Sequence, residues 1–245
     1  MIEDIKTMVW KEYKETFSRY GNTRRNLYPL LLFTAILGLY FPWVAGTDFV
    51  KAPVLLLFYI WFPLIMTFSM MIDSFAGERD RHTLETLLAS RLSDRSIVIG
   101  KILSVVIYGI GATIVFITVG LAVVNILHWN GHIQMFEVDV LLLMLLLALT
   151  IYTLLATLGI IVSIKAPTVR VGNDAMVGGL IAAAAVLYVL YFLVPEEWKA
   201  MIVDMYLSQA RIYLDLALAV AFIAICLAAL YVAVRMFRRS ELMLV

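Results

Sequence analysis

Long apolar runs separated by short polar stretches make up most of the chain. Each run approaches or exceeds the roughly 20 residues that a helix needs to cross the ~30 Å hydrocarbon layer of a bilayer. The runs are 28–44, 54–72, 102–127, 140–164, 176–194 and 214–237. Residues 141–147 are apolar on every side, unlike the alternating strands of a membrane β-barrel. The pattern therefore predicts an all-α membrane protein, a single transmembrane domain over residues 1–245 with six transmembrane helices.

The composition agrees with this prediction. Hydrophobic residues make up 63% of the 245 positions and charged residues only 15%, and the mean hydropathy is +0.96. A water-soluble globular protein of this size carries about 25% charged residues. We therefore expect a multi-pass protein of the cell membrane, in contact with the lipid bilayer.

The distribution of lysine and arginine predicts the orientation, because basic residues in short loops stay on the cytoplasmic side during insertion. If the N-terminus is inside, the inside segments hold 16 of the 19 basic residues. The outside loops then hold Lys51, Lys199 and Arg211. Both termini should be cytoplasmic. The net charge of +1 hides this segregation, which favours a membrane environment and gives no reason to expect a nucleic-acid partner.

Residues 1–21 have the periodicity of an amphipathic helix. Charged residues, among them Glu3, Lys6, Lys14 and Arg19, lie opposite an apolar stripe. The stripe recurs at steps of three and four residues and consists of Ile2, Ile5, Val9, Tyr13, Phe17 and Tyr20. Such a helix is typical of the membrane interface. The alternative is an ordinary cytoplasmic helix that packs on the rest of the protein.

The sequence contains no sign of its own catalytic or nucleotide-binding site. Gly100 and Lys101 are followed by Ile102 and lack the earlier glycine of a phosphate-binding loop, so we expect no ATP hydrolysis by this chain itself. Cys226 is the single cysteine, which excludes a disulfide within one chain. The loops between the runs leave no room for a soluble catalytic domain. We expect no catalytic residue, no metal and no bound cofactor.

Charged residues are missing from the middle of the apolar runs. Those near the runs, Asp73, Asp139, Asp215 and Arg235, lie at the ends. An ion-coupled carrier usually needs a charged relay at mid-depth, and an intramembrane enzyme needs clustered acidic or histidine residues. The pattern favours a hydrophobic or amphipathic cargo over a bare ion.

Two outer segments have open roles. His128 and His132 are four residues apart, a spacing that suits a metal on a helix, but the intervening Asn130 and Gly131 favour a turn, so interfacial histidines are the better interpretation. The loop 195–212 has apolar residues at helical spacing and could gate an exit path or cap the bundle.

Small residues in the last two runs predict close helix packing, since they let backbones approach. They are Gly178, Gly179, Ala182 to Ala185, Ala217, Ala221, Ala224 and Ala228.

The segment 76–100 is the long charged stretch between two apolar runs. A short apolar stripe of Leu84, Leu87 and Leu88 predicts a helix that Thr83 can cap, followed by a break at 90–92. Ser93 and Asp94 can then cap the helix that leads into the third run. A protein that grips such a tethered helix can transmit force to the bundle. A solvated charged loop is the alternative.

This segment resembles the signature of ABC-2 type transporter permeases, approximately E-R-E-x-G-T-L-E-x-L-L-x-x-P-V-S-x-x-x-I-x-x-G-K. The matching residues are Glu78, Arg79, Thr83, Leu84, Glu85, Leu87, Leu88, Ser93, Gly100 and Lys101. Two positions depart from the signature: His82 stands where the family usually has glycine and Arg91 where it usually has proline. The remainder of the chain agrees in layout, with an N-terminal interfacial "elbow" helix before six spans.

The resemblance implies the permease subunit of an ATP-driven exporter. Two permease chains, identical or paralogous, would pair, and each would receive a cytoplasmic ATPase subunit that binds ATP and magnesium. The loop would act as the coupling helix: ATPase dimerisation would pull on residues 81–90, Arg81 included, and tilt spans two and three against the elbow helix. Glu78, Arg79 and Glu85 would tie the two helices together or meet the ATPase. The leucines 84, 87 and 88 would fill a groove on the ATPase.

A different class of protein also fits the apolar runs. The alternative is a secondary carrier that needs no ATPase, or a membrane scaffold whose charged loop recruits another protein.

Overall fold

The structure is a computed structural model that describes residues 1–21, 32, 34–51, 56–198 and 211–237. Within these ranges it contains helices and no strands, which confirms the all-α prediction. The long helices are α1 (Ile2–Gly21), α5 (Leu56–Ile72), α8 (Asp94–Leu127), α9 (Val138–Lys165), α10 (Val169–Leu193) and α12 (Arg211–Met236). The short elements are the π-helices η1 (Thr34–Tyr40) and η3 (Asp73–Gly77) and the α-helices α3 (Phe41–Ala45), α4 (Asp48–Lys51), α6 (Glu78–Asp80) and α7 (Leu84–Leu88).

Four described helical segments are long and apolar enough to cross a membrane. They are Asp94–Leu127, Val138–Lys165, Val169–Val186 and Leu216–Met236. The second predicted run corresponds to α5, which has 17 residues. The first is represented by the shorter apolar segment Thr34–Ala45, and most of residues 28–33 lie outside the described part of the chain. The protein is therefore a multi-pass membrane protein with several crossing helices.

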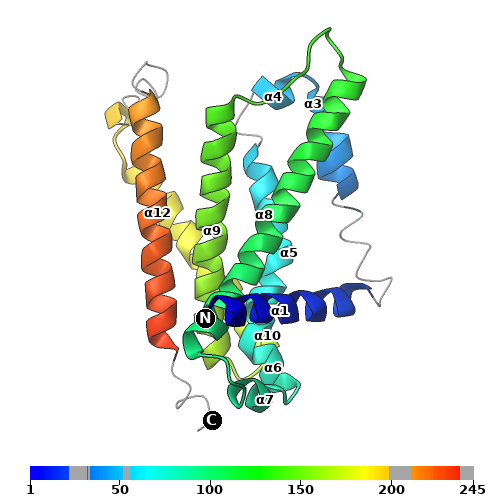
Figure 1. The fold of residues 1–245 in the computed structure, drawn as a ribbon. Coiled ribbons are helices and arrows are strands. Elements are labelled where there is room, and N and C mark those ends of the chain that lie inside the picture. The colour runs from blue at the N-terminus through cyan, green and yellow to red at the C-terminus, as the bar shows by residue number, and fades with distance from the viewer. Residues whose placement is uncertain (22–31, 33, 52–55, 199–210, 238–245) are drawn as a thin grey trace.

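Helices α8 and α9 form the centre of the bundle, and α5 packs against both (Figure 1). A large apolar cluster joins these helices and includes Met71, Ile97, Val105 and Ile160. A second cluster, around Phe49, lies where η1, α3 and α4 meet α8 and α9. Both clusters use residues of α8 and α9, so these two helices connect the apolar core.

A polar junction among α5, α8 and α9 lies beside Pro63. Proline has no backbone N–H, so the carbonyl of Tyr59, four residues earlier, loses its donor within the helix. The hydroxyl of Thr113 on α8 lies 3.3 Å from that carbonyl oxygen and 2.7 Å from the hydroxyl of Tyr152 on α9. Tyr152 donates in turn to the carbonyl of Ile60 at 3.0 Å. Hydroxyl groups of α8 and α9 thus lie against the α5 backbone beside Pro63.

Helices α10 and α12 lie at the periphery and leave most of their surface exposed. In α8 and α9, 44% and 39% of the most apolar window is buried, against 11% in both α10 and α12. The small residues predicted to pack closely face outward: a side chain at Gly178 or Gly179 would meet nothing within 4 Å, and Ala217 and Ala221 are exposed. The prediction of close packing at these residues is therefore wrong within a single chain.

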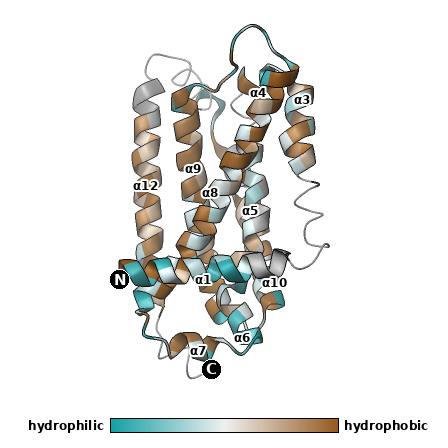
Figure 2. Cartoon of the chain, turned by 45° about the vertical axis from the view of Figure 1, so that its right-hand side comes forward, coloured by the Kyte–Doolittle hydropathy of each residue, from teal (hydrophilic) through white to brown (hydrophobic). Residues whose placement is uncertain are grey.

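Helix α1 confirms the predicted helix over residues 1–21 and lies across the end of the bundle (Figure 1). Figure 2 shows this helix between the apolar helices of the bundle and the end that holds α6 and α7. Its contact with α8 is centred on Met8, which is fully buried, whereas Ile2 at the start of the predicted apolar stripe is exposed. The face of α1 that meets the bundle is thus partly different from the predicted apolar face.

Candidate functional site

The segment 76–100 begins where α5 passes into the π-helix η3. A π-helix shifts the backbone hydrogen bonds by one residue and is frequent at functional sites. The hydroxyl of Ser163 on α9 donates to the carbonyl of Ile72 at 2.6 Å and accepts from the amides of Phe75 and Ala76, both at 2.8 Å. One serine thus fixes the end of α5 to α9 at the start of the site.

Lys101 is the centre of a buried charge cluster, which we define as Lys11, Glu12, Glu78 and Lys101. The Lys101 side chain is 1% exposed, and its ammonium donates to Glu12 Oε1 at 2.8 Å and to Glu78 Oε1 at 3.1 Å. It also donates to the carbonyl of Ser74 at 2.6 Å. A buried ammonium is costly unless its protons are bonded, and here three acceptors surround it.

Lys11 connects the same cluster to α1. Its ammonium binds Glu78 Oε1 and lies 3.2 Å from Glu15 Oε1 and 3.7 Å from Glu12 Oε1. Glu78, on α6, therefore receives one lysine from α1 and one from α8. Three elements that are distant in sequence are joined through one carboxylate.

The charges of the cluster stabilise one another. Burial would lower the pKa of Lys11, but the carboxylates around it, Glu78 first, hold this pKa above its ordinary 10.5. Burial would raise the pKa of Glu12, but the ammonium groups of Lys101 and Lys11 hold it below its ordinary 4.5. Both groups are thus charged at neutral pH.

Gly100 brings α1 close enough for the cluster to form. A Cβ atom at this position would lie 2.6 Å from Met8 Cβ and 2.7 Å from Met8 Cγ. Real side chains do not approach so closely, so glycine is required for this crossing of α1 and α8. The signature residues Gly100 and Lys101 therefore act together, one by providing space and the other by binding Glu12.

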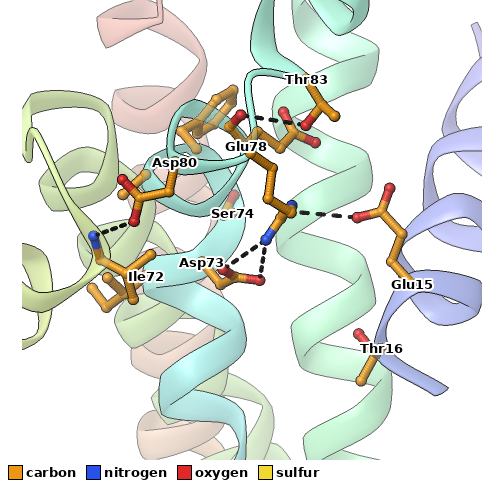
Figure 3. A network of polar contacts seen from close by, with 12 residues as sticks. Glu15, Thr16, Ile72, Asp73, Ser74, Glu78, Asp80 and Thr83 are labelled. Atoms are coloured by element: carbon orange, nitrogen blue, oxygen red, sulfur yellow. Dashed lines mark hydrogen bonds and ion pairs between the residues drawn. The ribbon is translucent and has the colours of Figure 1, made fainter. Parts of the chain in front are cut away.

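Arg79 and Asp80 bind the opposite side, where α9 ends and α10 begins. The Arg79 guanidinium donates to the carbonyls of Ala166 and Ile164, the latter at 3.1 Å. A carboxylate oxygen of Asp80 accepts from the amide of Val169 at 3.2 Å (Figure 3). Helix α6 therefore contacts α9 and α10 as well as α1 and α8.

Arg81 forms a second, more exposed link to α1. Its guanidinium lies 3.1 Å from Asp73 Oδ1 and 3.9 Å from Glu15 Oε2, and Figure 3 shows Asp73 and Glu15 facing each other across this link. Gly77 leaves the space that Asp73 occupies, because a Cβ there would lie 1.8 Å from Asp73 Oδ1. Exposed ion pairs contribute little, so the buried cluster is the stronger connection.

The turn after α6 contains an unusual backbone conformation. His82 has φ of 57°, the single positive φ at a non-glycine residue in the described ranges. This is the position where the related signature has glycine, which adopts such angles without strain. Thr83 occupies the predicted cap position of α7, but its hydroxyl donates to the Glu78 carbonyl at 3.3 Å and does not cap the helix. The predicted capping role of the Thr83 side chain is therefore wrong.

The start of α8 agrees with the sequence. Ser93 is the N-cap residue, and its hydroxyl oxygen accepts from the Ser96 amide at 3.2 Å, while Asp94 lies in the first turn. The break predicted at 90–92 is also present between α7 and α8.

The three leucines of α7 are buried in the large apolar cluster of this chain. Leu84, Leu87 and Leu88 therefore pack inside the molecule, and the structure does not offer them to a groove on another protein. The surface of the loop consists of exposed polar and charged side chains, together with Ala89. These residues are Arg81, His82, Thr83, Glu85, Thr86, Ala89, Arg91, Ser93 and Arg95.

The two histidines between α8 and α9 do not form a helical pair. His128 is the C-cap residue of α8, and its ring lies 3.3 Å from the position of a Cβ on Gly46. Gly131 has φ of 84°, which confirms the predicted turn. The Nε2 atom of His132 lies 3.3 Å from Nε2 of Gln134. Most of the loop 195–212 lies outside the described residues.

The sequence interpretation missed Lys11, Glu12 and Ser163. A signal for Glu12 was present, because Met8, Glu12 and Glu15 recur at steps of four and three and so share one face of α1. We know of no comparable local signal for Ser163, a small polar residue near the end of an apolar run.

Comparison with protein families gives a match to the ABC-2 type transporter model over residues 3–176. A comparison with curated proteins gave no match. The matched range includes α1, α5, the loop 76–100, α8 and α9, which together contain the buried charge cluster and its partners. Since the match covers well over half of the 245 residues, the chain belongs to the ABC-2 type transporter family.

Proposed function

We propose that this chain is the permease subunit of an ABC exporter and that a separate cytoplasmic ATPase docks on the loop 76–100. Family membership supports a transporter membrane domain. The observation that carries the docking site is the position of Glu78, which directly follows α5 and η3 and binds both Lys11 and Lys101. Movement of this loop would therefore displace α1 and α8 directly.

The proposed topology has six spans with both termini in the cytoplasm. Four crossing helices are joined by α5 and by the segment that includes Thr34–Ala45. The basic residues support the orientation, because 16 of 19 belong to the segments assigned to the inside. Helix α1 and the loop 76–100 lie at the same end of the bundle (Figure 2), as this topology requires.

In the proposed mechanism the loop is firmly attached to the helical bundle and transmits movement to it. The leucines of α7 anchor it in the core, the buried charge cluster fastens it to α1 and α8, and Arg79 fastens it to α9. ATP-driven closure of the ATPases would displace these elements as rigid bodies and shift the population between inward and outward access. ATP and magnesium would be bound by the ATPase subunit.

The ATPase would contact the exposed polar surface of the loop. We expect Glu85→Arg with Thr86→Arg to abolish co-purification with the ATPase, because both side chains are exposed on α7 and the change reverses and enlarges the local charge. A charge reversal at Glu197, which is exposed beyond α10, is the matched control and should leave association intact. Unchanged association of the α7 variant would contradict the docking site.

We propose that a second permease chain, identical or paralogous, covers part of the exposed α10 and α12 surface. Small residues on both helices permit close approach between chains.

The sequence has no charged residue in the middle of its apolar runs, which favours a hydrophobic or amphipathic cargo. Reconstitution with the ATPase and a screen of lipids, hydrophobic drugs and metal or sodium ions tests the cargo class. Stimulation by an ion alone would contradict it.

The second candidate is a carrier or scaffold that works without an ATPase. The same reconstitution separates the two functions. Substrate exchange by the purified chain without nucleotide would support a carrier, whereas transport that requires a Walker-type ATPase and ATP supports the exporter.

A further inference from the structure

Helix α1 lies at the depth where α8 enters its apolar segment. The contact between the two helices is at Met8 and Gly100, and Lys101 is the last charged residue of α8 before the apolar run 102–127. A helix that crosses a transmembrane helix at such a point lies in the plane of the lipid headgroups. The surface of α1 that points away from the bundle would therefore meet headgroups.

That outer surface contains Lys6, Trp10 and Lys14 at steps of four residues, a set that we call the α1 stripe. All three residues are exposed, and Trp10 is 71% exposed. Residues four apart on a helix share one face and are about 6 Å apart along its axis. Tryptophan prefers the membrane interface, and lysine attracts the phosphate groups of anionic lipids.

The charges on α1 are segregated between its two sides. Glu12 and Glu15 face the bundle and bind Lys101, Lys11 and Arg81, which removes two of the four carboxylates of α1 from the outer surface. Glu3 remains outside and binds Lys6 at 3.0 Å, but both side chains are more than two-thirds exposed. Such a pair is weak, so Lys6 stays available to another anion.

We propose that the α1 stripe is a binding site for the headgroup of an anionic phospholipid. The two lysines bind the anionic phosphates of the lipid headgroups, and Trp10 inserts its ring between neighbouring headgroups. The site goes beyond the proposed ATP-driven transport and needs no ATPase. Helix α1 is joined to Glu78 through the buried charge cluster. A lipid bound to the α1 stripe therefore also holds α1 in place while the loop moves.

The test uses the full chain in nanodiscs without the ATPase. Phosphatidylglycerol or phosphatidylcholine carrying a nitroxide near the headgroup quenches tryptophan at the interface, and subtraction of the Trp10→Phe variant isolates the signal of Trp10. We expect labelled phosphatidylglycerol to quench Trp10 more strongly than labelled phosphatidylcholine. The K6Q/K14Q variant should reduce this lipid selectivity about 5- to 25-fold, since each lysine near an anionic surface contributes a factor of about five.

The control is K165Q/R170Q, which removes the same charge from exposed positions at the ends of α9 and α10, outside the stripe. It should retain the selectivity for phosphatidylglycerol. Equal quenching by both lipids, or equal loss in the control, would overturn the site. Quenching of Trp10 by aqueous iodide and by neither lipid would also overturn it, and would place the stripe in water where a soluble partner could bind. Since the ATPase is absent, none of these results bears on its docking.

Discussion

The central helices α8 and α9 and the peripheral helices α10 and α12 are similarly apolar but differ in what covers them. The central pair buries about two-fifths of its most apolar residues, whereas the peripheral pair buries about one-tenth. The central pair also contains the polar groups that bind other elements, such as Lys101 and Ser163. Apolar composition thus places a helix in the membrane, and buried polar contacts determine which helices form the core of a single chain.

The largest expected effect comes from removing the cation at the centre of the cluster. Lys101→Ala leaves Glu12 and Glu78 as buried carboxylates without that partner, and we expect the chain to lose about 3–5 kcal/mol of stability. Thermal unfolding in detergent measures the loss. Arg170→Ala, at an exposed position near the start of α10, should change stability by less than about 0.5 kcal/mol. A similar effect of both substitutions would refute the difference between the two regions.

The second prediction compares two glycines. Gly100→Ala places a methyl group 2.6 Å from Met8 Cβ, so α1 must move and stability should fall by about 1–3 kcal/mol. Gly178→Ala meets no atom within 4 Å and, within a helix, should stabilise slightly. Accessibility of a cysteine label at Thr7, an exposed α1 position, reports the movement of α1. Met8→Gly should partly restore α1 in the Gly100→Ala background, and failure to do so would contradict the proposed contact.

The third prediction concerns the turn after α6. His82 has a positive φ, which costs an ordinary residue about 1–2 kcal/mol, so His82→Gly should stabilise the chain by up to about 1 kcal/mol after the greater freedom of glycine in the unfolded state is subtracted. The matched control is Thr86→Gly in α7, which should destabilise by about 0.5–1 kcal/mol. Denaturation curves of both variants give the comparison. Destabilisation by His82→Gly would contradict the backbone conformation.

The smallest expected effect is the pH dependence of the α1 contact. Because the folded-state pKa of Glu12 lies below 4.5, its contribution is complete above that pH and is lost as the pH falls through the lowered pKa. The raised pKa of Lys11 gives the opposite limit: its contribution is complete below 10.5 and is lost as the pH rises through the raised pKa. Labelling at Thr7 across pH should therefore show α1 bound between these limits. Glu12→Gln should remove the acid limb, and an unchanged acid limb would assign it to another carboxylate.

The apolar runs were sufficient to predict the helices but not their places in the bundle. The third run, 102–127, and its extension from Ser93 were both recognisable, because an apolar stretch and a serine cap are local signals. The outward position of Gly178 and Ala221 was not recognisable, since lipid tails and protein interiors are equally apolar. Small residues allow close packing without specifying which surface makes it.

Only part of the candidate site could be predicted from the sequence, for a similar reason. Glu78 and Lys101 were identified through the signature of the loop. Their partners Lys11 and Glu12 lie 67 and 89 residues away along the chain. Charged residues on an amphipathic helix are usually exposed. The face shared by Met8, Glu12 and Glu15 was the local sign of an inward Glu12, and Lys11 had no comparable sign. The close crossing at Gly100 is what makes the inward position possible.

Coupling between the loop and the bundle is measured most directly by the amount of substrate that the reconstituted complex transports per ATP hydrolysed. The variant Glu12→Gln, Glu78→Gln, Lys101→Met removes the charges of three cluster members together, which avoids an orphaned buried charge at these positions. If the cluster transmits movement from the loop to the bundle, this variant keeps ATPase docking and ATP hydrolysis but transports less substrate per ATP. An unchanged ratio with a folded, docked variant would contradict the account.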